Sequence, residues 1–325
     1  MFQINKRVLS IALVLMLLMT TLAACQQPED KPTVDENVIA KVNGENIYLE
    51  SFTKNFVVVE KRYNEWYTEN IWSQEINGKT VLEIVKGQVL DKLITEELIK
   101  QEADKKGIKV DEAKVEETYT TFKERLDQDE TLKTFYAENN LDDEFVKKQI
   151  SMEMLVSEYE KTVIDELGLK GEKLDEITKD YVVQVRAKHI LIKDETKAKE
   201  ILEKAKAGED FTTLAKENSE DPSAKDNNGD LGFFPRNAMV PEFEEAAFSL
   251  NIGEISELVK TEYGYHIIKV EGKKTISDLK DEISEEELAM EKKNVEAKII
   301  QDKFIEKIEE LKSNAEIEKF EENLK

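Results

Sequence analysis

The hydrophobic pattern of the chain changes its period twice, and this limits the folds open to it. Between residues 80 and 166, apolar side chains recur at the three- and four-residue spacing of helices. Over residues 181–192 and 265–271 they alternate instead, which is typical of strands. From about residue 276 to residue 325 the spacing is helical again. The order predicts an α+β chain with a short strand-containing segment between two helical segments.

The two helical segments need each other. Ile300, Phe304, Ile308 and Leu311 form one apolar stripe near the C-terminus, and such a stripe requires a partner surface. The nearest source is the N-terminal half, which opens with a predicted hairpin around Asn43-Gly44. We therefore expect the two ends to fold together around an inserted domain. The predicted divisions are a signal segment 1–24, a tether 25–36, an N-terminal helical segment 37–180, the inserted domain 181–272 and a C-terminal helix 273–325.

The N-terminus has the pattern of an export signal. Lys6 and Arg7 precede an apolar run over residues 8–19, which is too short to span a bilayer. The stretch from Leu22 to Cys25 resembles the lipobox of bacterial lipoproteins, in which the cysteine carries a diacylglyceryl group. Two acyl chains anchor a protein stably, so the resemblance implies attachment to the membrane through Cys25. The alternative is an ordinary cleaved signal followed by a chance cysteine.

Composition excludes several classes of function. The formal net charge of -24 would repel nucleic acid, so we expect no nucleic-acid partner. The single cysteine excludes an intramolecular disulfide and a thiolate metal cluster. A hydrophobic content of 40% is enough to build a core in each of two or three domains.

Both histidines of the chain lie in the strand-containing segment, each on the apolar face of a predicted strand. Buried histidines often have only a structural role, in which hydrogen bonds satisfy the imidazole. Here the surrounding motifs favour a site instead. They are Arg186-Ala187-Lys188-His189-Ile190-Leu191, Ser219-Glu220-Asp221, Gly229-Asp230-Leu231-Gly232-Phe233-Phe234, the pair Met239 and Phe243, and Tyr263-Gly264-Tyr265-His266-Ile267-Ile268.

The order and spacing of these motifs resemble the parvulin family of prolyl isomerases across residues 182–271. Together with the lipobox, the hairpin and the C-terminal helix, they are similar to the PrsA-type foldase lipoproteins of Gram-positive bacteria. The resemblance implies a parvulin-like domain, a small antiparallel sheet flanked by helices, inserted in an all-α chaperone-like frame. It also implies a peptidyl-prolyl cis/trans isomerase that assists folding of secreted proteins at the outer face of the cytoplasmic membrane.

The resemblance assigns roles residue by residue. Leu231, Met239 and Phe243 would form the apolar pocket for the substrate proline ring. His189 and His266 would be paired at the floor of the site, and Asp221 stands where some relatives have cysteine. That substitution argues against a covalent mechanism that needs a sulfur nucleophile. Tyr263, which stands where other relatives have serine, would also bind the substrate.

These residue types suit the chemistry. An X–Pro bond rotates over a barrier of about 18–20 kcal/mol because amide resonance is lost in the twisted state, and no bond need be made or broken. A catalyst needs an apolar cup for the ring and polar groups that favour the twisted amide. We expect no cofactor and no metal, since two histidines and one aspartate form no established zinc motif.

Two other functions remain open from the sequence. The first is a holdase chaperone in which the helical frame binds clients and the isomerase is secondary or inactive. The second is a solute-binding lipoprotein, which would be expected to show alternating strands and helices throughout. As partners we expect unfolded secreted proteins with X–Pro bonds, and the membrane. A homodimer is also possible, because the N-terminal helices carry apolar surface on more than one side.

Overall fold

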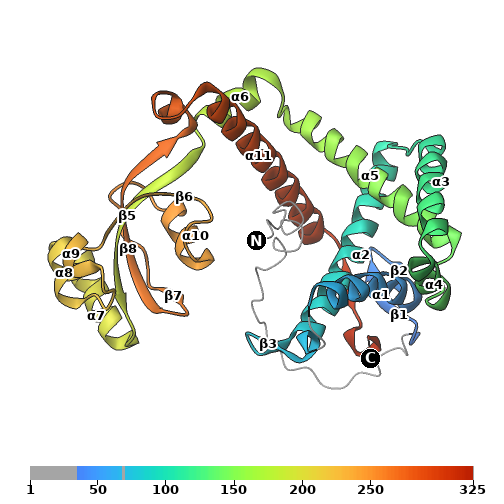
Figure 1. The fold of residues 1–325 in the computed structure, drawn as a ribbon, viewed down its shortest axis with the longest axis horizontal. Coiled ribbons are helices and arrows are strands. Elements are labelled where there is room, and N and C mark those ends of the chain that lie inside the picture. Colours follow the sequence, from blue (N-terminus) through green and yellow to red (C-terminus); the bar gives the residue numbers. More distant parts are fainter. Residues whose placement is uncertain (1–34, 68–69, 325) are drawn as a thin grey trace. The chain divides into compact units, whose positions relative to one another are not determined.

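The computed structural model describes residues 35–67 and 70–324. The chain forms two compact units (Figure 1). Unit 1 comprises the chain up to Val163 together with Phe304–Lys325, and unit 2 comprises Ile164–Lys303. The expected signal segment, Cys25 and most of the tether lie outside the described residues.

Unit 1 is built on a small sheet with the strand order β2-β1-β9. Strands β1 (Val38–Val42) and β2 (Glu45–Tyr48) form the expected hairpin, and Asn43 and Gly44 at its turn both have positive φ. Strand β9 (Ile317–Lys319) pairs with the other edge of β1. A second hairpin consists of β3 (Glu75–Ile76) and β4 (Lys79–Thr80).

Helices make up most of the rest of unit 1. They are α1 (Leu49–Trp66), α2 (Val81–Lys106), α3 (Glu112–Gln128), α4 (Glu130–Glu138), most of α5 (Asp143–Leu167), the end of α11 (Glu285–Asn314) and the short turns η1 (Ile71–Ser73) and η3 (Glu321–Asn323). Helix α2 begins with a capping box between Thr80 and Glu83 and ends at Gly107 in the left-handed conformation. Its apolar residues are buried on more than one side, as the sequence predicts for the N-terminal helices.

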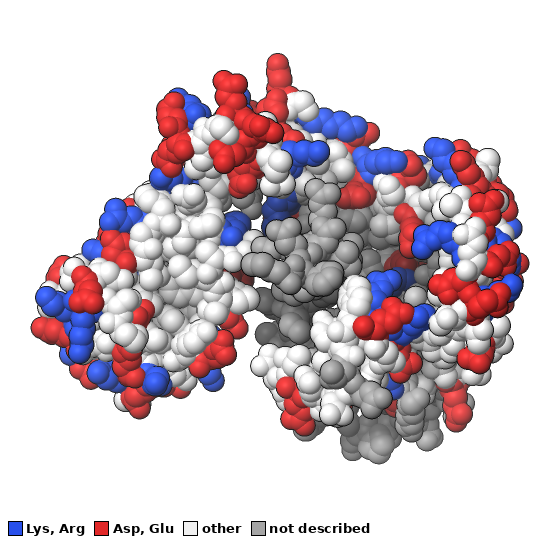
Figure 2. All heavy atoms as spheres, viewed as in Figure 1, with Lys and Arg blue, Asp and Glu red and all other residues white. Residues whose placement is uncertain are grey.

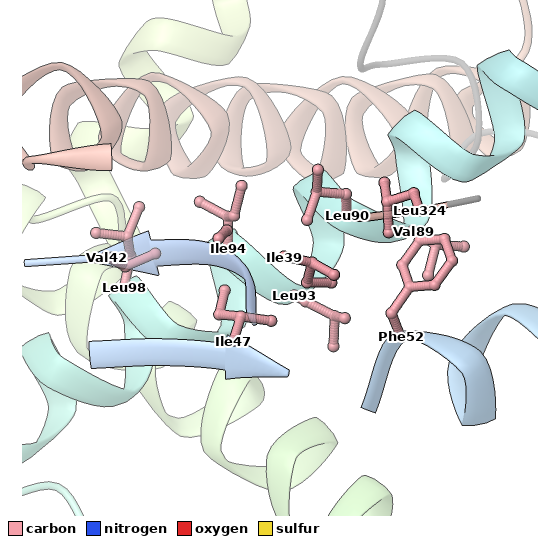
Figure 3. Close-up of a cluster of buried hydrophobic side chains, with 11 residues drawn as sticks. Ile39, Val42, Ile47, Phe52, Val89, Leu90, Leu93, Ile94, Leu98 and Leu324 are labelled. Carbon is pink, nitrogen blue, oxygen red and sulfur yellow. The ribbon is translucent and has the colours of Figure 1, made fainter. Parts of the chain in front are cut away.

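The core of unit 1 joins the two ends of the chain. Ile39 and Val42 of β1 pack against Leu90 and Ile94 of α2, and Leu324 from the C-terminus completes the cluster (Figure 3). Of the predicted C-terminal segment, residues 304–325 belong to unit 1, where β9 pairs with β1, whereas residues 273–303 belong to unit 2. A second cluster centres on the fully buried Tyr159 of α5 and includes residues of α11.

Unit 2 contains a four-stranded antiparallel sheet with the order β6-β5-β8-β7. Its strands are β5 (Val182–Ile192), β6 (Asp230–Pro235), β7 (Val259–Thr261) and β8 (Gly264–Thr275). The helices are α6 (Gly171–Lys179), α7 (Glu195–Lys206), α8 (Phe211–Asn218), α9 (Ala224–Asn227), α10 (Pro241–Ser249), the turn η2 (Ile276–Asp281) and the first part of α11.

The central strands of this sheet are covered on both faces. Ile190, Ile192 and Ile267 pack with α7 and α8, whereas Val185, Ile268 and other residues of β5 and β8 pack with α10. Because side chains alternate across a strand, both odd and even positions of β5 become apolar near its end. The expected α+β class, with a small antiparallel sheet flanked by helices, is confirmed.

Three short elements differ from the sequence expectation. No separate helix was predicted over residues 170–180 or 219–230, yet the first of these segments forms α6 and the second contains α9. The C-terminal segment was expected to stay helical to residue 325, but α11 ends at Asn314 and β9 follows. Each segment is too short to display a period, and β9 is decided by packing of Ala315 and Ile317 on the distant core.

Charge is spread over the surface in both signs. Figure 2 shows acidic and basic side chains interspersed, with a largely uncharged area over the visible face near β6 and α10. Many ion pairs join residues three or four apart on helices, as in Lys199 with Glu195. Such exposed pairs contribute little stability, because water and salt screen their attraction. Within residues 35–67 and 70–324, no helix is long and apolar enough to cross a membrane.

The shared core predicts a stability effect at the C-terminus. Leu324→Ala should lower the free energy of unfolding of unit 1 by about 2 kcal/mol, because it removes a buried side chain from the cluster around β1. Urea unfolding monitored by tryptophan fluorescence measures this directly, since Trp66 and Trp72 both lie in unit 1. The control Ile76→Ala, at a side chain that is 46% exposed, should change little. Equal midpoints for both variants would contradict the shared core.

Candidate active site

The pairing of β5 with β8 brings the two histidines together. Leu191 lies opposite His266 and His189 lies opposite Ile268 in the antiparallel register. Both histidines therefore point to the face of the sheet that α10 covers. Each is only 5% exposed, although imidazole is a polar group, so hydrogen-bond partners are required.

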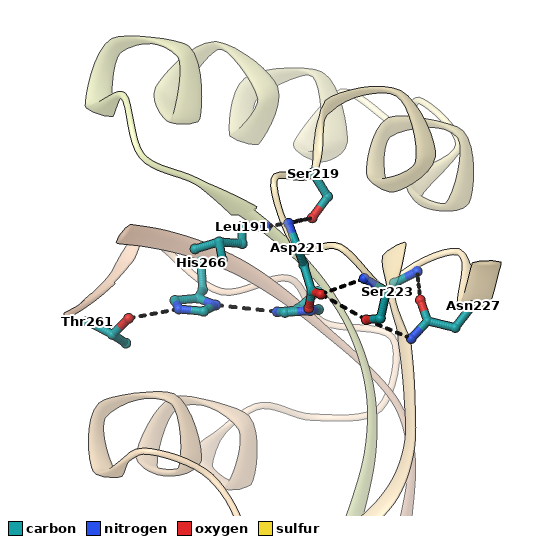
Figure 4. Close-up of polar contacts among 9 residues, drawn as sticks. Leu191, Ser219, Asp221, Ser223, Asn227, Thr261 and His266 are labelled. Atoms are coloured by element: carbon teal, nitrogen blue, oxygen red, sulfur yellow. Dashed lines mark hydrogen bonds and ion pairs between the residues drawn. The ribbon is translucent and has the colours of Figure 1, made fainter. Parts of the chain in front are cut away.

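A continuous line of polar contacts supplies those partners (Figure 4). The Nδ1 atoms of His189 and His266 lie 3.3 Å apart, and the rings stack with an interplanar angle of 18°. His189 Nε2 lies 2.6 Å from Asp221 Oδ2. At the other end, His266 Nε2 lies 2.8 Å from the Thr261 hydroxyl. Four side chains from three separate stretches of chain thus form one chain of contacts.

The loop before β6 positions Asp221. The Ser219 hydroxyl accepts hydrogen bonds from the backbone N–H groups of Leu191 and Asp221, at 3.1 and 3.3 Å. This links the loop to the end of β5. The carboxylate of Asp221 then accepts hydrogen bonds from the backbone and the hydroxyl of Ser223. The geometry fixes one carboxylate oxygen on His189 and the other on Ser223.

Two glycines allow the strands to approach closely here. The carbonyl of Gly229 accepts the backbone N–H of His189 at 2.9 Å, and a Cβ at Gly229 would lie 2.5 Å from the carbonyl oxygen of His189. At Gly264 a Cβ would lie 2.9 Å from the carbonyl oxygen of Ile192. Both residues also have positive φ, at 75° and 139°. Glycine is therefore required at both positions, because a side chain would collide with the neighbouring carbonyl and because the backbone has positive φ.

The environment sets the charges of the site. Burial lowers the pKa of His189 below its ordinary value, and the hydrogen bond that His189 donates to Asp221 offsets this only in part. Burial and repulsion from His189 lower the pKa of His266 to about 4. Burial opposes ionisation of Asp221, but hydrogen bonds from Ser223 and His189 outweigh it and hold the pKa of this carboxyl below its usual value. At neutral pH the site contains two neutral imidazoles and one carboxylate.

These charges fix the direction of every hydrogen bond in the network from Thr261 to Asp221. An ionised Asp221 can only accept, so His189 donates from Nε2–H and its Nδ1 is an acceptor. His266 must then donate from Nδ1–H, which leaves its Nε2 to accept from the Thr261 hydroxyl. Protons therefore point from Thr261 through both histidines toward Asp221. The result is a buried network with one negative end.

Apolar residues lie against this network. Leu231 of β6, Met239 and Phe243 of α10 belong to the cluster that packs on this face of the sheet. The edge of the Phe243 ring contacts both imidazoles, at centroid distances of 5.7 and 5.3 Å. Leu231 and Met239 are only partly buried, so apolar surface stays open beside the histidines.

Six of the seven residues named from the sequence meet at this site: His189, Asp221, His266, Leu231, Met239 and Phe243. Tyr263 differs, because it is 56% exposed and only its backbone N–H reaches the network, through the Thr261 hydroxyl. Neither Thr261 nor Ser223 was predicted from the sequence. The tight turn at Glu262-Tyr263 could have indicated Thr261, because a two-residue turn places Thr261 opposite Gly264 in the β7–β8 hairpin.

Comparison with known proteins decides the family. The family model described as "PPIC-type PPIASE domain" matches residues 172–274, and "SurA-like N-terminal domain" matches residues 1–160. A "Foldase protein PrsA" of Caldanaerobacter subterraneus subsp. tengcongensis is 40% identical, with 98% of both chains covered. The chain belongs to the PrsA foldase family. With its PPIC-type domain, this member of the PrsA family is a peptidyl-prolyl isomerase.

Other proteins are also similar to this PrsA-family chain. A "Foldase protein PrsA" of Clostridium botulinum is 33% identical, with 98% of each chain covered. Among solved structures, a peptidylprolyl isomerase (PrsA) from Bacillus cereus is 29% identical, covers 90% of this chain and 97% of its own, and has a TM-score of 0.35. NmPin, the parvulin of Nitrosopumilus maritimus, is 48% identical over 28% of this chain and 97% of its own, with a TM-score of 0.26.

The lowered pKa of His266 predicts a pH dependence of stability in unit 2. The folded-state pKa of about 4 lies below the unfolded value of 6.5, so the unfolded state binds more protons between these values. Stability should be full above pH 6.5 and fall by on the order of 2 kcal/mol as the pH drops to 4. Asp221 would add its own loss at lower pH, because its pKa is also lowered.

Urea unfolding at pH 7.5, 5.5 and 4.5 measures this, monitored by the methyl NMR signals of Ile267 and Ile268. The variant His266→Gln should show a clearly smaller change over the same interval. The same pH dependence in the variant and in the wild type would contradict the assignment.

Proposed function

We propose that His189, Asp221 and His266 are the catalytic residues for isomerisation of X–Pro bonds, with Leu231, Met239 and Phe243 as the pocket for the proline ring. The observation that carries the proposal is the directed network from Thr261 to Asp221, which ends in a negative charge and whose histidines lie against a partly open apolar cluster. Tyr263 would contact the substrate at the exposed edge of the site.

The mechanism follows from what changes during rotation. A planar amide has partial negative charge on oxygen and partial positive charge on nitrogen, and both decrease when rotation breaks resonance. A fixed carboxylate near the prolyl carbonyl therefore penalises the planar amide more than the twisted one. The apolar residues hold the ring and exclude water, which would otherwise favour the planar dipole.

The neutral histidines have a defined part in this scheme. Their N–H groups are committed to His189 and Asp221, so they hold the carboxylate ionised and in place without giving up a proton. The Phe243 ring packs edge-on against both of them and keeps the imidazoles from rotating. No nucleophile or metal is needed for the step, because no covalent bond changes.

A protease-coupled assay on X–Pro tetrapeptides tests the site with the full mature chain. His189→Ala and Asp221→Ala should each lower kcat/KM about 10- to 100-fold. Asp221→Ala removes the negative charge of the network, and His189→Ala removes the imidazole that joins Asp221 to His266. Met239→Ala should mainly raise KM, because it removes apolar contact with the ring. The control Ile252→Ala, at an exposed side chain of the same unit, should match the wild type.

Folded Asp221→Ala with full activity would refute the electrostatic role. A folded wild type that is inert on every peptide would favour the holdase alternative instead. One feature of unit 1 supports client binding of that kind: Trp66 and Tyr67 at the end of α1 are about half exposed, and Tyr63 packs against Tyr67 and Trp72. Exposed aromatic side chains are suited to contact unfolded chains.

We also propose that the protein works outside the cytoplasmic membrane on secreted clients, with a lipid on Cys25 as its anchor. The support is the signal pattern of residues 1–24, the lipobox-like stretch that ends at Cys25, and the polar tether that follows. A lipid anchor near the export site would keep the isomerase where unfolded chains emerge. The mature protein would then need no membrane-spanning helix.

Cys25→Ser tests the anchor. In a Gram-positive host, the wild type should partition into the membrane fraction and incorporate a labelled fatty acid, whereas the variant should incorporate none. Lys31→Ala in the tether is the matched control and should behave like the wild type. Equal labelling of wild type and Cys25→Ser would exclude the lipid at this position.

A further inference from the structure

Asp221 is held from two sides, and only one of them is His189. Its Oδ2 atom lies 2.6 Å from His189 Nε2, whereas Oδ1 accepts the backbone N–H of Ser223 at 2.9 Å and the Ser223 hydroxyl at 2.8 Å. Hydrogen bonds to a carboxylate are stronger than those between neutral groups. Two donors on Oδ1 therefore favour the ionised form and fix the rotation of the carboxylate about its own axis.

The hydroxyl of Ser223 does not cap the helix that follows it. Ser223 is the residue before α9, but its side chain makes no capping hydrogen bond to that helix of four residues. Its proton is donated to Asp221, and its oxygen accepts the Asn227 side-chain N–H at 3.2 Å. The direction of donation thus runs from Asn227 through Ser223 to Asp221.

Asn227 connects this branch to the backbone of His189. Its Oδ1 accepts the N–H of Gly229 at 2.9 Å, and the carbonyl of Gly229 accepts the N–H of His189 at 2.9 Å. The contacts therefore form a closed circuit from Asp221 through Ser223, Asn227 and Gly229 to His189, and through its ring back to Asp221. Displacement of any member changes the distance between carboxylate and imidazole.

We propose that Ser223 and Asn227 are positioning residues for the isomerisation: they hold Asp221 as the fixed acceptor of the network and thereby set the direction of the hydrogen bonds through both histidines. The inference rests on the proposed function. Without the two donors on Oδ1, Asp221 can take up a proton and donate to His189 Nε2, which would reverse the histidine hydrogen bonds. The negative end of the network would then be lost.

The test uses the full mature chain and a tetrapeptide assay without protease, with kcat/KM measured from pH 3.5 to pH 8, because the pKa of Asp221 lies below its usual value. Ser223→Ala should lower kcat/KM about tenfold at pH 7, which is the effect of losing one hydrogen bond to a charged group. It should also move the acid limb of the profile to higher pH, because Asp221 then protonates more easily. Ser223→Thr keeps the hydroxyl and should restore both. Asn227→Ala should shift the limb in the same direction by a smaller amount.

Thr213→Ala is the matched control. Thr213 donates its hydroxyl and its backbone N–H to Asp210, at 2.7 and 2.8 Å, in the same unit but at an exposed helix cap. Its loss removes the same kind of contact and should leave the pH profile unchanged. Circular dichroism checks that each variant is folded, and Asn227→Ala provides the test if Ser223→Ala does not fold.

Two outcomes separate the inference from the proposed function. If Asp221→Ala loses activity while folded Ser223→Ala and Asn227→Ala keep the wild-type acid limb, the positioning role is wrong and the site stands. A uniform loss at every pH that Ser223→Thr does not restore would also overturn it. If Asp221→Ala and His189→Ala keep full activity, the proposed site itself fails.

Discussion

The hydrogen bond between His189 and Asp221 is the interaction on which the site depends. It joins a buried strand to a loop and puts a carboxylate next to an imidazole that burial keeps neutral. From this one contact the proton positions of both histidines and of Thr261 follow, because an ionised carboxylate can only accept. A buried charge is costly unless it is hydrogen-bonded, and the donors on Asp221 meet that requirement.

The sheet of unit 2 explains why this contact can form. The register of β5 and β8 sets His189 and His266 on one face, and Gly229 and Gly264 allow the neighbouring backbone to approach where a Cβ would collide. Helix α10 then covers that face with Phe243, which contacts both imidazoles. In unit 1 a different long-range pairing, β9 on β1, closes a separate core.

Much of the fold could be predicted from the sequence, because long segments show the hydrophobic period of a helix or a strand. The alternation over 181–192 identifies β5, and the spacing of α2 predicts burial on two sides. The meeting of His189, Asp221 and His266 came from the resemblance to parvulins. Local pattern could not reveal β9, whose three residues gain their stability from β1 far away in the chain, or α9, which has only four residues. Nor could it reveal Ser223, whose role depends on rotation of one carboxylate.

The direction of the hydrogen bonds determines which nitrogen of each imidazole carries the proton, and nitrogen NMR of the full mature chain measures this. At pH 7 both rings should be neutral and should be opposite tautomers, with the proton of His189 on Nε2 and that of His266 on Nδ1. Since the chain has two histidines, His266→Gln assigns the signals. A protonated imidazolium at pH 7, or the same tautomer for both rings, would contradict the account.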